Sequence, residues 1–177
     1  NTLQLNGADQ SVSGGPFLWT GHANTRVLAA DVGADGGRWQ AAHDGYASRD
    51  RPVLHRRTVE LDGALRELHI LDEVRSPRAH RCTLAFHLGP SITAELVGDT
   101  AWLSWPHRSR PDHRHTAVLA LPADLDWTAH RGETDPPLGW YSPGFGRREP
   151  ATTLLGAGRS SGVGGVTAFA TLLRFTS

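Results

Sequence analysis

The tetrapeptide His43-Asp44-Gly45-Tyr46 places an imidazole, a carboxylate and a phenol next to one another in the chain. Side chains of these types move protons in many enzymes, so the segment is a candidate acid–base group. Asp-Gly is also a typical turn dipeptide, and a turn that closes a strand over 38–43 explains the same residues. The sequence leaves both interpretations open.

Histidine is abundant, with ten residues in the chain. His113 and His115 flank Arg114, and in an extended strand this spacing puts both rings on one face. A cupin-like barrel could hold a metal there if a carboxylate and another nitrogen converged on the pair. Because the pair follows Pro111-Asp112, in what reads as a loop entering a strand, solvated histidines are the simpler interpretation.

The segment 139–155, GWYSPGFGRREPATTLL, is the most distinctive stretch of the chain. Its prolines exclude a helix and its glycines allow a bend, so it predicts a shaped turn flanked by strands. In one interpretation Trp140, Tyr141, Arg147 and Arg148 face a ligand. In the other, the aromatic side chains of the bend belong to the core.

The six tryptophans offer a second route to ligand binding, because exposed indoles can stack on sugar rings. A stand-alone carbohydrate-binding module would use such platforms. In a domain of this size most of the tryptophans should be buried, and we expect no more than two to be exposed.

Composition limits the remaining possibilities. Lys and Arg number 18, as do Asp and Glu, so no overall field draws the protein to nucleic acid or to an anionic membrane. No run of residues is long and apolar enough for a membrane span. The single cysteine, Cys82, excludes an internal disulfide and is expected to be a buried apolar residue. The chain starts with Asn1, directly in strand-like sequence, so we expect an excised piece, and its compartment cannot be inferred.

Short apolar segments between closely spaced glycines and prolines predict the fold class. The segment 81–88 alternates Cys82, Leu84, Phe86 and Leu88 with polar or small residues and is the clearest strand. In 52–61, Val53, Val59 and Leu61 share a face, with His55 and Arg57 between them. The segment 65–74 fits a helix or a strand, and its neighbours favour a strand with Glu67, His69 and Glu73 outside. About a dozen such strands predict an all-β antiparallel sandwich with few or no helices, and one domain over residues 1–177.

Several motifs, in this order along the chain, resemble one family. They are NTLQLNGADQS at the start, HDGY at 43–46, PVLHRRTVEL at 52–61, FHLGP at 86–90, LALP at 119–122 and GWYSPGFGRREPATTL at 139–154. Together they resemble the C-terminal β-sandwich of the heparinase II/III-like polysaccharide lyases, a group that includes related alginate lyases. The resemblance covers nearly the whole chain.

The resemblance implies a parent enzyme that cleaves uronate-containing polysaccharides by β-elimination. An N-terminal α/α toroid carries most catalytic groups, and the sandwich packs against it to close the substrate cleft. A tyrosine and a histidine usually transfer the protons, and Asn or Arg neutralises the uronate carboxylate. Members often bind a divalent metal, commonly zinc, near the junction. One ligand histidine of the family directly precedes the Asn-Thr that opens this sequence, so it falls one residue before Asn1.

The chain departs from the family pattern because the toroid is missing. We therefore expect no catalytic residue and no cofactor in this chain, and no activity for it alone. Its expected partners are an acidic polysaccharide and the parent's toroid. Residues expected to line the junction or contact substrate are Asn1, Gln10, His43, Tyr46, Trp140 and Tyr141, although roles in turn or sheet hydrogen bonds would explain them equally well. The alternatives are the carbohydrate-binding module, the cupin-like metal barrel and a purely structural β domain.

Overall fold

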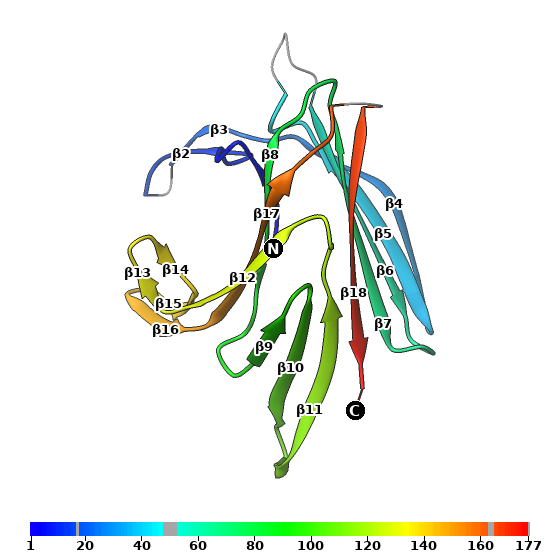
Figure 1. Cartoon of the computed structure of the whole chain (residues 1–177), viewed down its shortest axis with the longest axis vertical. Helices are drawn as coiled ribbons and strands as arrows, with labels where there is room; N and C mark the ends of the chain where they lie inside the picture. The colour runs from blue at the N-terminus through cyan, green and yellow to red at the C-terminus, as the bar shows by residue number, and fades with distance from the viewer. Residues whose placement is uncertain (17, 48–52, 163–164, 177) are drawn as a thin grey trace.

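The computed structural model describes residues 1–16, 18–47, 53–162 and 165–176, and within these ranges every regular element is a β-strand. Two antiparallel sheets form a sandwich (Figure 1). The smaller sheet has four strands in the order β1-β8-β17-β12, and the larger has eight in the order β4-β5-β6-β7-β18-β11-β10-β9. The all-β prediction is confirmed. No helix in the described part is long and apolar enough to cross a membrane.

The smaller sheet consists of β1 (Leu3–Leu5), β8 (Arg81–His87), β17 (Thr152–Arg159) and β12 (Asp126–Arg131). The larger sheet consists of β4 (Thr25–Gly33), β5 (Gly36–His43), β6 (Leu54–Asp62), β7 (Glu67–Arg75), β18 (Val166–Phe175), β11 (Arg110–Ala120), β10 (Thr100–His107) and β9 (Thr93–Val97). Three two-stranded ribbons complete the fold: β2 (Val12–Gly15) with β3 (Leu18–Gly21), β13 (Glu133–Thr134) with β14 (Pro137–Leu138), and β15 (Trp140–Gly144) with β16 (Arg147–Pro150).

The core lies between the two sheets and follows from the alternation in the sequence. Cys82, Leu84 and Phe86 of β8 are buried, as their spacing predicts. They pack in one cluster with Val74 of β7 and Phe169 of β18. The buried face of the smaller sheet therefore meets the central strands of the larger one, and this face of the larger sheet is its inner face.

The segment 65–74 forms a strand, as its neighbours indicated, and the strand itself, β7, runs over Glu67–Arg75. Its strand pairs with β6 on one side and β18 on the other. Glu67 lies with His69 and Glu73 on the face opposite the inner one, as expected, but Glu67 is buried there rather than exposed. Its carboxylate is held by Arg174 and His69, and these partners offset the cost of burying a charge.

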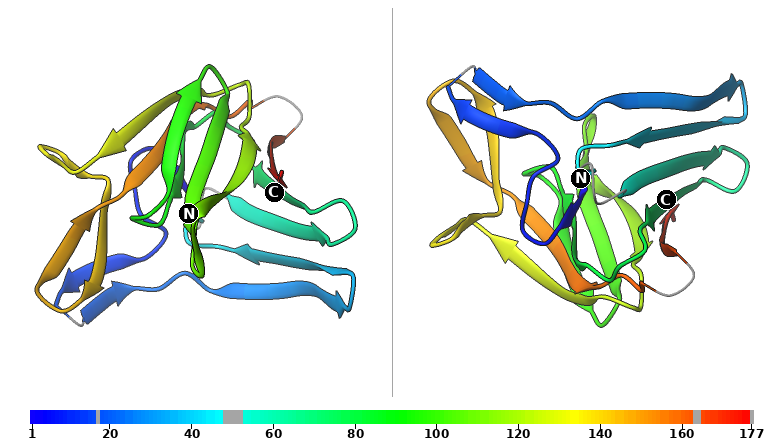
Figure 2. Two further views of the ribbon diagram at one scale, coloured as in Figure 1. Left: turned by 90° about the horizontal axis from the view of Figure 1, so that it is seen from below. Right: turned by 90° about the horizontal axis from the view of Figure 1, so that it is seen from above.

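The smaller sheet covers only part of the inner face. Strands β4 to β7 extend beyond it (Figure 2). Cross-strand register places Val32 beside Gly37 and Leu61, and Ala30 beside Trp39 and Val59, on this uncovered part. Val32 is 90% exposed, Leu61 47% and Trp39 42%. We call Val27, Val32, Trp39 and Leu61 the inner strip. It is an exposed apolar surface on the inner face, whose remaining part is covered by the smaller sheet.

Candidate functional site

A row of polar side chains crosses the inner face where the two sheets meet. His43 on β5 lies opposite His55 on β6, and Arg57 on β6 lies opposite Asp72 on β7. Nε2 of His43 is 2.9 Å from Nδ1 of His55, and Nε2 of His55 is 2.6 Å from Oδ1 of Asp72. His55 and Asp72 are both buried. We call His43, His55, Arg57 and Asp72 the clamp.

Hydrogen-bond roles in the clamp follow from its chemistry. The backbone N–H of Gly45 donates to Nδ1 of His43 across 3.2 Å, so that nitrogen carries no hydrogen. Nε2 of His43 then donates to Nδ1 of His55, and Nε2 of His55 donates to Asp72. Both nitrogens of His43 are therefore occupied inside the protein. This is the geometry of a structural imidazole closing an Asp-Gly turn.

The protonation of His43 agrees with that assignment. Burial lowers the pKa of His43 to about 4, and electrostatic interactions with His55 and Arg57 reinforce this effect despite the opposing effect of Asp44. Burial alone would raise the pKa of Asp72. Hydrogen bonds from His55 and Arg57 outweigh burial, so the pKa of Asp72 lies below its usual value. At neutral pH the clamp thus holds a neutral His43 and an ionised Asp72.

Arg57 connects the clamp to the start of the chain. Its Nε and Nη2 donate to the two oxygens of Asp72 at 2.8 and 2.9 Å, a bidentate pair. Its Nη1 donates to the backbone carbonyl of Asn1 at 2.6 Å. The side chain of Asn1 in turn accepts a hydrogen bond from the backbone N–H of His87 on β8. The first residue is therefore tied to both sheets.

Two other expected residues lie in the same neighbourhood. The hydroxyl of Tyr46 donates to the carbonyl of Leu3 at 2.8 Å and lies 3.4 Å from Oε1 of Gln10. Burial, reinforced by Asp9, raises the pKa of Tyr46 to about 12, so the phenol stays protonated. Gln10 and His43 also line a cavity of about 210 Å³. Of the six expected residues, Asn1, Gln10, His43 and Tyr46 are thus brought together.

Trp140 and Tyr141 lie apart from the clamp, on the ribbon β15–β16 (Figure 1). The indole Nε1 of Trp140 donates to the carbonyl of Glu133 at 2.7 Å, and the guanidinium of Arg148 lies 4.2 Å from the indole ring centre. Trp140 therefore contacts Arg148 of its own ribbon and ties that ribbon to the neighbouring ribbon β13–β14. Tyr141 and the turn residue Phe145 are exposed, which leaves the outer part of the ribbon available for contacts.

The family is decided by a match over almost the entire sequence. The family model described as "Heparinase II/III-like, C-terminal" matches residues 1–172. The chain belongs to the heparinase II/III-like C-terminal family. A comparison with curated protein sequences finds no match.

Solved structures agree with this family at the level of the fold. Heparan sulfate lyase HepC from Pedobacter heparinus superposes with a TM-score of 0.65 at 9% identity, over 87% of this chain and 22% of that one. A heparinase III structure gives a TM-score of 0.67 at 13% identity, over 99% of this chain and 23% of that one. Another heparinase III, the BT4657 gene product, gives a TM-score of 0.64 at 11% identity, over 86% of this chain and 22% of that one. This heparinase II/III-like domain thus spans less than a quarter of the length of these three chains.

The divalent metal suggested by the family resemblance does not fit the described residues by themselves. Among them, no group of three or more His, Cys, Asp or Glu side chains is placed to hold a metal ion. His43 offers no open ring nitrogen. His115 lies within strand β11, not in a loop leading to it, and its ring stacks on Trp105 and His107. A metal at the junction would need further ligands from outside the described residues.

Tryptophan exposure differs from the sequence-based expectation. Trp19, Trp39 and Trp102 are exposed, while Trp105, Trp127 and Trp140 are half-buried. The expectation of at most two exposed indoles is wrong. Trp39 lies where the larger sheet extends past its partner, Trp19 lies on the projecting ribbon β2–β3 (Figure 1), and Trp102 lies on the face of β10 opposite the buried Ala101 and Leu103.

The centre of the clamp, formed by His55, Arg57 and Asp72, was not among the site residues predicted from the sequence. A signal for it exists. His55, Arg57 and Val59 share one face of β6, and Val53, just before the strand, continues the same every-second-residue spacing, so a polar pair lies between apolar residues. A buried cation requires a buried anion, and Asp72 is the carboxylate whose register on β7 supplies it.

Proposed function

We propose that this heparinase II/III-like domain is the accessory β-domain of a larger polysaccharide lyase, which cleaves uronate-containing polysaccharide by β-elimination. The observation that carries the proposal is the family match over residues 1–172. The share of the solved heparinase and heparan sulfate lyase chains that the domain covers, 22–23%, supports a larger parent.

Elimination needs a base for the proton beside the uronate carboxylate, an acid for the departing oxygen, and a group that neutralises the carboxylate. The clamp residues and Tyr46 do not provide these groups. His43 is neutral with both nitrogens engaged, the phenol of Tyr46 is protonated and bonded to Leu3, and Arg57 is neutralised by Asp72. We therefore assign the chemistry to the rest of the parent enzyme, and the chain alone is inactive.

In this proposal the clamp fixes the junction. Arg57 holds the carbonyl of Asn1, so polypeptide preceding Asn1 would leave from the inner face beside the cavity lined by Thr2 and Trp39. Trp39 is part of the inner strip. The preceding domain of the parent is the occupant that we propose for the strip, because it would begin beside this surface and would bury apolar side chains that water now contacts.

The ribbon β15–β16 is the part of the domain that we propose contacts the acidic polysaccharide. It carries the exposed Tyr141 and Phe145 together with Arg147 and Arg148. Aromatic side chains beside arginines suit a polyanionic sugar chain, since the arginines pair with its acidic groups and the rings cover its apolar faces.

The test is an elimination assay. The parent enzyme and the chain 1–177 are each incubated with heparan sulfate, alginate and hyaluronan, and the ultraviolet absorbance of unsaturated uronate is followed. We expect signal from the parent on at least one polysaccharide and none from the chain alone. No signal from the parent on any of them, with sugar affinity retained by the chain, would favour the stand-alone carbohydrate-binding module.

A further inference from the structure

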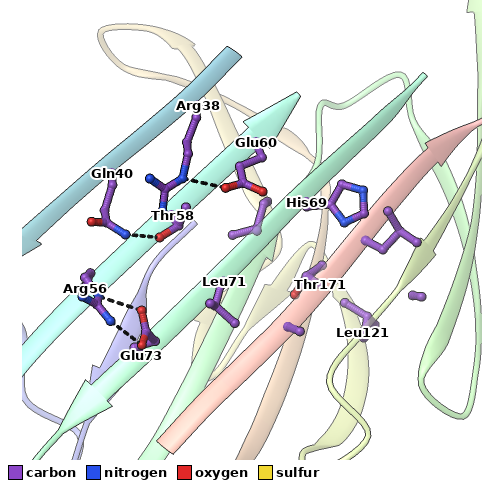
Figure 3. Close-up of a pocket in the computed structure, with 14 residues that line it drawn as sticks. Arg38, Gln40, Arg56, Thr58, Glu60, His69, Leu71, Glu73, Leu121 and Thr171 are labelled. Atoms are coloured by element: carbon purple, nitrogen blue, oxygen red, sulfur yellow. Dashed lines mark hydrogen bonds and ion pairs between the residues drawn. The ribbon is translucent and has the colours of Figure 1, made fainter. Parts of the chain in front are cut away.

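A groove crosses the face of the larger sheet opposite the inner face. It has a volume of about 610 Å³ and is lined by residues of β5, β6, β7, β18 and the end of β11 (Figure 3). Five neighbouring strands span about 19 Å at the usual spacing between strands. The groove is thus long in one direction, and its volume lies within the usual range for ligand sites, about 300–1,000 Å³. Neither the clamp nor the inner strip contributes to it.

Charges in the groove cancel in pairs. Nε of Arg38 donates to Glu60 at 2.6 Å, and Arg56 makes a bidentate pair with Glu73, with Nε to Oε2 at 2.6 Å (Figure 3). Two arginines thus face two glutamates. A sulfated or carboxylated chain would meet carboxylates as often as guanidinium groups, so the groove lacks the net positive charge that attracts polyanions.

The other lining groups suit a ligand rich in hydroxyls. Nε2 of Gln40 donates to the hydroxyl of Thr58 at 2.7 Å, and His69 stands further along the same face (Figure 3). Amide, hydroxyl and carboxylate groups offer donors and acceptors side by side. Leu71 and Leu172 supply an apolar floor between them. Alternating polar and apolar surface is what a pyranose presents, with hydroxyls at its rim and C–H groups on its faces.

An exposed tryptophan stands beside the β11 end of the groove. Ala120 lines the groove, and Val118 points to the same face two residues earlier in β11. Trp102 of β10 lies directly opposite Val118 and is 55% exposed. A half-exposed indole next to a polar groove is a suitable stacking platform for a sugar ring.

We propose that this outer groove, together with Trp102, is a binding site for an uncharged oligosaccharide segment. The site is separate from the proposed lyase function, since it lies on the other face of the larger sheet and its charge balance disfavours acidic polysaccharide. Trp102 stacks on one sugar ring, and Gln40, Thr58 and the Arg–Glu pairs hydrogen-bond to hydroxyls of the following ones.

Titration of chain 1–177 with cellohexaose and with maltohexaose tests the proposal. Binding is followed by the NMR shifts of the Trp102 indole and of the β5–β7 amides. We expect one or both hexasaccharides to shift these signals, and Trp102→Ala to weaken binding roughly tenfold. The matched control is Trp19→Ala, which removes an indole of similar exposure from the ribbon β2–β3 and should leave affinity unchanged.

A heparan sulfate hexasaccharide is the charge control. We expect it to bind the groove more weakly than the neutral probe, and the double variant Glu60→Gln/Glu73→Gln to reverse that order by leaving Arg38 and Arg56 uncompensated. Three results would each overturn the proposal: no shift with either neutral probe, binding that Trp102→Ala leaves intact, or tighter binding of the sulfated probe by the unmodified chain. All of these readouts are independent of lyase activity.

Discussion

Nε2 of His55 lies 2.6 Å from Oδ1 of Asp72, and both side chains are buried between the two sheets. Arg57 contacts the same carboxylate and reaches back to the carbonyl of Asn1. One buried anion therefore organises two strands of the larger sheet and the start of the chain. Buried charges of this kind are tolerated only when they are fully partnered, so the clamp should be sensitive to the loss of any one member.

Replacement of the central carboxylate should be costly. In Asp72→Asn, Arg57 and His55 lose their buried anion, and we expect the free energy of unfolding to fall by about 3–5 kcal/mol. Urea denaturation followed by tryptophan fluorescence measures it. Glu60→Gln removes one member of the exposed Arg38 pair and should cost less than about 1 kcal/mol. Equal losses in the two variants would contradict the role assigned to Asp72.

The clamp should also make stability depend on pH. Between its ordinary pKa of 6.5 and its folded pKa of about 4, His43 binds a proton in the unfolded chain and not in the folded one. Stability contributed by His43 is therefore complete above pH 6.5, falls as the pH drops to about 4, and is constant below that. Because His43 is partly exposed, we expect a loss of only about 1–2 kcal/mol.

His43→Gln isolates this effect. The variant keeps a polar side chain and has no titrating ring, so the difference in unfolding free energy between the unmodified chain and the variant should shrink from pH 7 to pH 4.5. The pair is compared by urea denaturation at several pH values. A difference that stays constant across this range would show that His43 does not titrate as assigned.

Gly156 should not tolerate a side chain. It lies opposite Trp127, and a Cβ at position 156 would come within 2.6 Å of the indole ring. Trp127 is itself held by a hydrogen bond to the carbonyl of Pro122, so Gly156→Ala should lower the free energy of unfolding by about 1–3 kcal/mol. Gly144→Ala, where a Cβ meets nothing within 4 Å, is the control and should change little. Thermal unfolding distinguishes the two variants.

The inner strip should make the isolated chain self-associate. Sedimentation velocity should show a larger species that grows with concentration, because the exposed apolar side chains have no cover. Val32→Thr/Leu61→Thr should shift the population to monomer. The control Val97→Thr changes an exposed valine on the outer face and should leave the proportion of monomer unchanged. A monomer at all concentrations would argue against the strip as a docking surface.

The sequence predicted the sandwich well and the clamp only in part. Strands such as β6 and β8 were recognisable because their alternation is imposed by a buried face. The ribbon β2–β3 was not predicted, because β2 is exposed along its whole length and no alternation marks it. The turn of the ribbon β15–β16 was predicted from its glycines and prolines, and strands do flank it. Of the bend at Phe145, only Gly146 adopts a left-handed conformation, with φ of 68°.

The features that could not be predicted from the sequence depend on pairing between strands and on how the two sheets overlap. His43 and Tyr46 were selected for their chemistry, and their neutral, bonded state depends on residues brought to them by the sheet. Asp72 is 29 positions from His43 in the numbering, and only the register β5–β6–β7 places it behind His55. The exposure of Trp39 depends on how far the larger sheet extends past the smaller one, which no local pattern encodes.

The central claim is that the chemistry lies outside this domain while the domain remains necessary for it. The most direct measurement compares initial rates of unsaturated-uronate formation by the parent enzyme, the parent truncated before Asn1, chain 1–177, and an equimolar mixture of the two pieces. We predict activity for the parent, none for either piece alone, and partial recovery in the mixture. Elimination by chain 1–177 alone, or full activity of the truncated parent, would contradict the account.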